Sequence, residues 1–119
     1  MLILARKMGQ IPFSDLMAVY AESNGKLARE QWPEEPEGMR LYRAEMDFYQ
    51  YLRHDFFTQG DGIYALWMVE GKPVSAVRFE KWKDGVLLEA LETRPDQRRK
   101  GYGFLLMRAA LKEVRGKVY

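Results

Sequence analysis

Hydrophobic side chains recur at helical spacing through the first half of the chain. Residues 2–7 begin with a short apolar run and are predicted to form a strand. After it, large side chains return every three or four residues and predict an amphipathic helix, with the apolar stripe Phe13, Leu16, Met17 and Tyr20. We expect the Ser14 hydroxyl to cap this helix and Gly25 to weaken or end it.

A second helical stripe follows a loop. Residues 32–38 contain two prolines and a glycine, which interrupt regular structure. A helix is then predicted at about residues 39–57, because one face carries Leu41, Phe48, Leu52 and Phe56. His54 is expected on the surface of this helix, without a catalytic role. The aromatic residues expected mainly in its core-facing positions are Tyr42, Phe48, Tyr49, Tyr51, Phe56 and Phe57.

The pattern then changes to that of strands. Residues 63–70, 74–82 and 86–93 are rich in branched and aromatic side chains, as strands are. The dipeptides Gly71-Lys72 and Asp84-Gly85 separate these segments and are typical of tight turns. The three strands are therefore expected to be antiparallel neighbours.

The last part of the chain is again helical. Pro95 lacks an amide N–H and ends the preceding strand, and apolar positions then repeat at helical spacing over residues 103–115. Gly116 is expected to cap this helix, and residues 118–119 to open a further strand. The order of strand, two helices, three antiparallel strands and helix predicts an α+β fold with a mixed sheet.

Length and composition limit the classes of protein that fit. The chain has 119 residues, which suits a single domain over residues 1–119. Its formal charge of +2 disfavours a dedicated nucleic-acid binder. Because cysteine is absent and His54 is the only histidine, thiolate or histidine metal clusters and cysteine nucleophiles are excluded. The apolar start is too short for a signal peptide or a membrane span, so a cytoplasmic location is expected.

The segment of residues 98–103 carries the clearest chemical signal. It lies between a predicted strand and a predicted helix, whose first N–H groups lack internal partners and attract anions. Gly101 and Gly103 let the backbone approach a phosphate, and the preceding basic side chains add positive charge. Leu106 stands where a dinucleotide fingerprint has its third glycine, and no Gly-Lys pair is followed by Ser or Thr as in a P-loop. We therefore expect a binding loop for a pyrophosphate.

These residues resemble the signature of the GNAT superfamily of acyl-CoA-dependent N-acyltransferases. Arg98, Gly101 and Gly103 fill its core motif, with Pro95-Asp96 before it and an apolar helix after it. The resemblance in element order covers nearly the whole chain. It implies coenzyme A as cosubstrate and no metal, with the pyrophosphate on the loop and the pantetheine arm along the preceding strand. The implied cofactor-binding residues are Leu91, Glu92, Thr93, Arg98, Arg99, Lys100, Gly101, Tyr102, Gly103 and Phe104.

The resemblance also implies direct attack of an amine on a thioester, with a general base that removes the ammonium proton. Glu89 is the candidate base, because family members often carry a glutamate near this position. Strict alternation along the strand predicts that Glu89 shares a face with Leu91 and Thr93. It also predicts that Glu92, the second choice, points to the other face. Either carboxylate could act directly or through a water molecule.

The chain departs from the family pattern near its C-terminal end. A typical member continues with a fifth strand, another helix and two more strands. That part forms one wall of the acceptor site and often supplies a tyrosine that protonates the leaving thiolate. Tyr119 stands at the start of the fifth strand, so it is not given that role. We expect a truncated or naturally short member whose open sheet edge favours a homodimer or a swapped assembly.

Three functions stay open at this level. The first is transfer of an acetyl group from acetyl-CoA to a primary amine on a small molecule or peptide. The second is an acyl-CoA-binding module or inactive fragment, which would bind coenzyme A without turnover. The third is a nucleic-acid-binding domain that uses residues 94–100. The near-neutral charge disfavours it, and strongly salt-dependent binding would reveal it.

Overall fold

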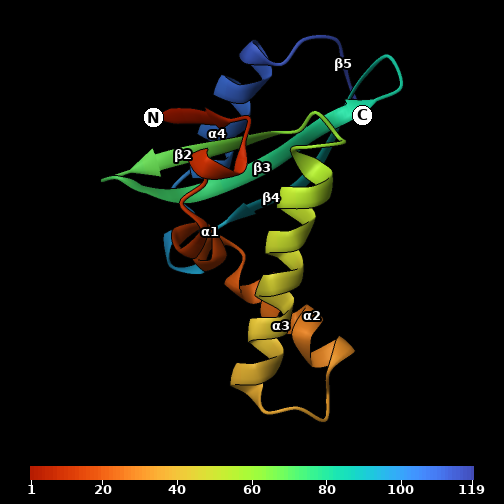
Figure 1. The fold of residues 1–119 in the computed structure, drawn as a ribbon. Helices are drawn as coiled ribbons and strands as arrows, with labels where there is room; N and C mark the ends of the chain where they lie inside the picture. Colours follow the sequence, from red (N-terminus) through yellow and green to blue (C-terminus); the bar gives the residue numbers. More distant parts are fainter.

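A single mixed sheet organises the molecule. The computed structural model describes residues 1–119 and contains five strands with helices on both faces (Figure 1). In spatial order the strands are β1 (Leu2–Ala5), β2 (Ile63–Val69), β3 (Lys72–Trp82), β4 (Gly85–Thr93) and β5 (Lys117–Val118). Neighbouring strands are antiparallel except β4 and β5, which are parallel. The expected α+β class with a mixed sheet is therefore confirmed.

Helices cover the two faces unequally. α4 (Tyr102–Glu113) packs on one face, and α1 (Phe13–Val19), α2 (Ala21–Gln31) and α3 (Glu37–Gln50) lie on the other side (Figure 1). Two short 3₁₀ turns, Met8–Gln10 and Pro95–Gln97, complete the helical elements. α3 continues directly into a π-helical segment, Tyr51–Phe56. No helix combines the length and the apolar character needed to cross a bilayer.

The sheet separates two hydrophobic clusters. The larger lies on the α1 side, and its biggest members are Leu16, Tyr20, Leu52, Phe56 and Tyr64. The smaller joins α4 to the opposite face through Ala65, Val77, Phe79, Leu106 and Ala110. Burial of Leu106 and Ala110 fixes α4 against β2 and β3, and this holds the start of α4 close to the end of β4.

Two sequence predictions about the first helices are wrong. Ser14 lies inside α1 and makes no capping hydrogen bond. Gly25 lies inside α2, and the break between α1 and α2 falls at Tyr20 instead. Tyr20 makes a long-range hydrogen bond to β4, described below, so its position depends on a tertiary contact that local spacing does not contain.

Four further predictions meet mixed outcomes. α4 ends at Glu113, and Gly116 is not its cap but a turn residue with φ of +88° before β5. His54 is exposed, as expected. Tyr42 is not a core residue, because 59% of its surface is exposed. The long second helix is confirmed, although its last six residues take the π-helical form.

Gly62 packs against the ring of Phe56 just before β2. A Cβ atom at Gly62 would come within 2.5 Å of that fully buried ring. We expect Gly62→Ala to lower the free energy of unfolding by about 1–3 kcal/mol, because the ring must move within a packed core. Urea denaturation measures the change. Gly9→Ala is the control, since its Cβ meets nothing within 4 Å, and equal losses in both variants would refute the packing argument.

Candidate functional site

The junction between β4 and α4 forms the first part of the site. After the 3₁₀ turn Pro95–Gln97, the chain passes through two left-handed residues, Arg99 with φ of +66° and Gly101 with φ of +79°. Glycine adopts this conformation without steric cost, whereas arginine does not. The local backbone is therefore bent sharply just before the first turn of α4.

The backbone amides of this loop have no internal partners. No backbone carbonyl accepts a hydrogen bond from the N–H groups of residues 98–104, and the first bond of α4 runs from the Leu105 amide to the Gly101 carbonyl at 3.0 Å. A Cβ atom at Gly101 would meet nothing within 4 Å, so the loop is open there. Free amides at the positive end of a helix dipole are suited to bind an anion.

The basic side chains of the loop differ in their contacts. Arg98 donates a hydrogen bond to Glu22 of α2 at 3.1 Å, and Lys100 donates one to Gln97 at 3.0 Å. Arg99 makes no ion pair. The Arg98 side chain thus ties the loop to α2, whereas the Arg99 side chain is free to contact an anion.

A cavity of about 430 Å³ adjoins the loop beside the β2–β3 turn. Its lining residues are Val69, Glu70, Lys72, Val74, Arg94, Gln97, Lys100 and Tyr102. Arg94 is paired with Asp96 at 2.6 Å, so Lys72 and Lys100 supply most of its unpaired positive charge. Because Glu70 also lines the cavity, its net unpaired charge is +1, so the cavity beside the loop is only weakly positive.

The outer edge of β4 is the second part of the site. β5 pairs only with the start of β4, and the last bond runs from the Leu88 amide to the Tyr119 carbonyl at 3.0 Å. Beyond that point no strand covers the edge that faces away from β3. The predicted residues Leu91, Glu92 and Thr93 lie on this uncovered stretch, where an extended ligand can pair as an added strand.

A β-bulge in β4 changes which side chains share a face. Glu89 lies opposite Arg78 and Glu92 lies opposite Ala76, so three steps along β4 match two steps along β3. Ala90 is the extra residue of the bulge, and its φ is +54°. Paired residues of antiparallel strands point to the same face, so Glu89 and Glu92 both point to the α1 side.

The predicted arrangement of these carboxylates is therefore wrong. Thr93 lies opposite Ser75 and points to the α4 side, and Leu91 shares that face because it alternates with Glu92. Glu89 does not share a face with Leu91 and Thr93. The alternation rule failed because it assumes an unbroken strand, whereas the bulge at Ala90 shifts the alternation by one residue.

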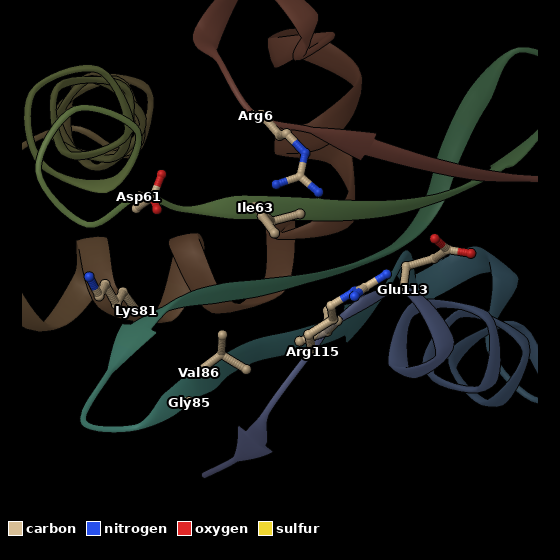
Figure 2. A pocket seen from close by; sticks show the side chains of 9 residues that line it. Arg6, Asp61, Ile63, Lys81, Gly85, Val86, Glu113 and Arg115 are labelled. Carbon is tan, nitrogen blue, oxygen red and sulfur yellow. The ribbon is translucent and has the colours of Figure 1, made fainter.

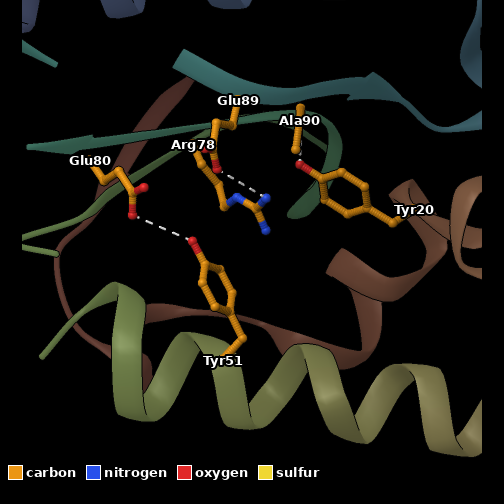
Figure 3. A network of polar contacts seen from close by, with 6 residues as sticks. All are labelled: Tyr20, Tyr51, Arg78, Glu80, Glu89 and Ala90. Atoms are coloured by element: carbon orange, nitrogen blue, oxygen red, sulfur yellow. Dashed lines mark hydrogen bonds and ion pairs between the residues drawn. The ribbon is translucent and has the colours of Figure 1, made fainter. Parts of the chain in front are cut away.

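Arg78 lies at the centre of a polar network on the α1 side of the sheet (Figure 3). Its guanidinium donates to Glu89 at 3.4 Å and lies 5.5 Å and 5.0 Å from the ring centres of Phe48 and Tyr51. Its Nε atom is buried without a partner. The Tyr51 hydroxyl donates to Glu80 at 3.4 Å, and burial raises the pKa of Tyr51, so the phenol keeps its proton.

Glu92 extends this network along β4. It accepts a hydrogen bond from the Ser23 hydroxyl of α2 at 2.7 Å. Glu80, Glu89 and Glu92 together place three carboxylates on this face, whereas Arg78 contributes one guanidinium. This excess of negative charge attracts cations. No group of three or more His, Cys, Asp or Glu side chains is placed to hold a metal ion.

Sequence reasoning missed most of this network. It identified Glu89 and Glu92 and named Tyr51 among the aromatic residues expected mainly in the core, but it did not single out Ser23 or Arg78. One signal was present: charged residues stand at alternate positions 78 and 80, on either side of the apolar Phe79. Such charges are rarely buried without a partner or a function, so they mark the polar face of β3.

Another charged cavity, of about 310 Å³, lies at the opposite end of the sheet (Figure 2). Its charged lining residues are Arg6, Asp61, Lys81, Glu113 and Arg115. It lies beside the last turn of α4, where the carbonyl end of the helix dipole disfavours anions. The loop before α4 therefore fits a diphosphate better than this cavity does.

Comparisons with known proteins agree on one fold. The chain is similar to the PaiA N-acetyltransferase of Thermoplasma acidophilum, solved with coenzyme A, at 9% identity and a TM-score of 0.55, covering 95% of this chain and 71% of that one. It is similar to a GNAT family acetyltransferase of Staphylococcus aureus subsp. aureus at 14% identity and a TM-score of 0.57, covering 99% and 97%. At these identities the likeness shows the fold alone.

A third structure and a family model complete the comparison. The ribosomal-protein-alanine N-acetyltransferase of Brucella melitensis biovar Abortus 2308 is 14% identical with a TM-score of 0.58, covering 95% of this chain and 70% of that one. No curated protein matches the sequence. The model of the acetyltransferase (GNAT) family matches residues 19–119. Since that match spans most of the chain, the protein belongs to the GNAT family of acyl-CoA-dependent N-acyltransferases.

Proposed function

We propose that this chain transfers an acetyl group from acetyl-CoA to a primary amine. The observation that carries the proposal is the row of free backbone amides over residues 98–104, which opens onto the unobstructed side of Gly101. Diphosphates bind to such amides because these supply hydrogen bonds and positive potential together. Within this family, the ligand that carries a diphosphate beside a thioester arm is acyl-CoA.

The same geometry suggests how the cosubstrate lies. The amides of residues 99–104 and the Arg99 side chain hold the diphosphate, while Arg98 braces the loop through Glu22. The pantetheine arm pairs with the uncovered edge of β4 at Leu91, Glu92 and Thr93. This path brings the thioester towards the bulge at Ala90, next to the carboxylate of Glu89.

Glu89 is the proposed general base. An acceptor amine arrives as an ammonium, and its proton must leave before the nitrogen lone pair can react. With Glu89 as acceptor of the first proton, the nitrogen bonds to the acyl carbon, the C–S bond breaks, and the sulfur departs as a thiolate. The nitrogen then loses its second proton, which the thiolate takes up. The three carboxylates on this face also favour a cationic acceptor over an anionic one.

Ligand-induced stabilisation and thiol release test the proposal together. Coenzyme A at about a hundred times its dissociation constant should raise the free energy of unfolding by roughly 2.7 kcal/mol. Adenosine, which lacks the diphosphate, should have no such effect at equal concentration. Acetyl-CoA with a panel of primary amines should release free thiol, measured by a colorimetric thiol reagent.

The outcomes separate the candidate functions. Stabilisation by coenzyme A without thiol release from any amine would favour the acyl-CoA-binding module. Lack of stabilisation by coenzyme A would contradict the diphosphate loop itself. The self-association expected from the sequence stays a prediction, which light scattering at micromolar concentration checks.

A further inference from the structure

Tyr20 connects the break between α1 and α2 to the bulge of β4. Its side chain is buried, with 2% of the residue exposed, and its hydroxyl donates to the Ala90 carbonyl at 2.6 Å (Figure 3). Burial raises the pKa of Tyr20 far above the neutral range, so the hydroxyl stays a donor at any pH of interest. This is a direct bond between the first two helices and the most irregular residue of β4.

The backbone conformation of Ala90 requires a stabilising contact of this kind. Its φ of +54° lies in the left-handed region, which a residue with a Cβ atom adopts only when surrounding structure holds it there. The buried Ser75 hydroxyl lies on the other face of the sheet and donates a hydrogen bond to the Glu92 carbonyl at 2.9 Å. The bulged segment is thus held by side-chain donors on both faces.

We propose that Tyr20 is a positioning residue for acyl transfer, which fixes the β4 bulge through the Ala90 carbonyl. This inference rests on the proposed function. If Ala90 relaxed to an extended conformation, the alternation along β4 would shift by one residue. Glu89 would then turn away from the acceptor side, while the free amides before α4 would stay in place.

Tyr64 is a suitable comparison for Tyr20. It belongs to the same cluster and is equally buried, but its hydroxyl makes no hydrogen bond to β4. The two hydroxyls are close enough to influence each other's pKa, so only the contact with β4 distinguishes them. Tyr20→Phe and Tyr64→Phe each remove one hydroxyl, from two neighbouring side chains. Only Tyr20→Phe removes a hydrogen bond to β4.

Amide hydrogen exchange and steady-state kinetics test the inference. In Tyr20→Phe we expect exchange at the Ala90 and Leu91 amides to accelerate about tenfold and kcat to fall about tenfold, the effect of losing one buried hydrogen bond. The dissociation constant of coenzyme A should change less than about twofold, since the amides before α4 are untouched. Tyr64→Phe should leave exchange at these amides and kcat near wild type.

Several results would overturn the inference. These are unchanged exchange at Ala90 in Tyr20→Phe, an unchanged kcat, or equal effects from Tyr64→Phe. A parallel loss of coenzyme A affinity and kcat would also oppose it, because general destabilisation explains that result. If the wild-type protein releases no thiol with any amine, the proposed function fails, and the exchange measurement still decides whether Tyr20 holds the bulge.

Discussion

Gly101→Asp should weaken coenzyme A binding by about a hundredfold, the loss expected when a carboxylate is placed a few ångströms from a diphosphate. Gly101 faces open space, so the new side chain causes no steric clash within the protein. It would instead occupy the region from which the ligand approaches the free amides. Isothermal titration calorimetry with coenzyme A measures the change directly.

Backbone strain must be separated from this effect. Gly101 has φ of +79°, and any side chain there destabilises the loop. Gly71 is a matched control, because its φ is +80° and its Cβ would also meet nothing within 4 Å. Gly71→Asp should lose similar conformational stability but retain coenzyme A affinity. Equal affinity losses in both variants would remove residues 98–104 from the binding site.

Glu89→Gln should lower kcat by about a hundredfold or more, because general base catalysis contributes rate factors of that order. The amide keeps the shape of the side chain and can still accept a hydrogen bond from Arg78, which lies 3.4 Å away in the native protein. It cannot take a proton from an ammonium. The coenzyme A affinity should stay within about twofold of wild type, since Glu89 lies outside the amide loop.

Glu92→Gln provides the comparison for Glu89→Gln. The bulge places both carboxylates on the acceptor side, and Glu92 is already hydrogen-bonded to Ser23. We expect a smaller loss of kcat in Glu92→Gln than in Glu89→Gln. The reverse order would identify Glu92 as the base. Near-native rates in both variants would mean that neither carboxylate takes the proton.

The loop before α4 was predictable because its determinants are local. Arg98, Gly101 and Gly103 stand within six residues of each other, between a strand signal and a helix signal. The two hairpins were predictable for the same reason, but both turns lie one residue earlier than predicted. The left-handed residues are Glu70, Gly71 and Lys83, whereas Lys72 and Gly85 already belong to strands. The order of β2, β3 and β4 followed from these short connections.

Features set by contacts distant in sequence were not predictable. The bulge at Ala90 depends on a hydroxyl seventy residues earlier in the chain, and it reversed the predicted orientation of the neighbouring carboxylates. The first helix break lies at Tyr20 instead of Gly25, at the residue that makes this contact. The pairing of Arg78 with rings from α3 and the π-helical segment likewise requires the folded sheet.

Amide resonances of the loop report most directly on the central claim. Saturation with coenzyme A should shift the ¹⁵N–¹H signals of Arg99 through Phe104 strongly, because these free amides acquire phosphate acceptors. Signals near the cavity at Arg6 and Arg115 should move little. Binding of coenzyme A that leaves the Arg99–Phe104 signals in place would contradict the claim that backbone amides before α4 hold its diphosphate.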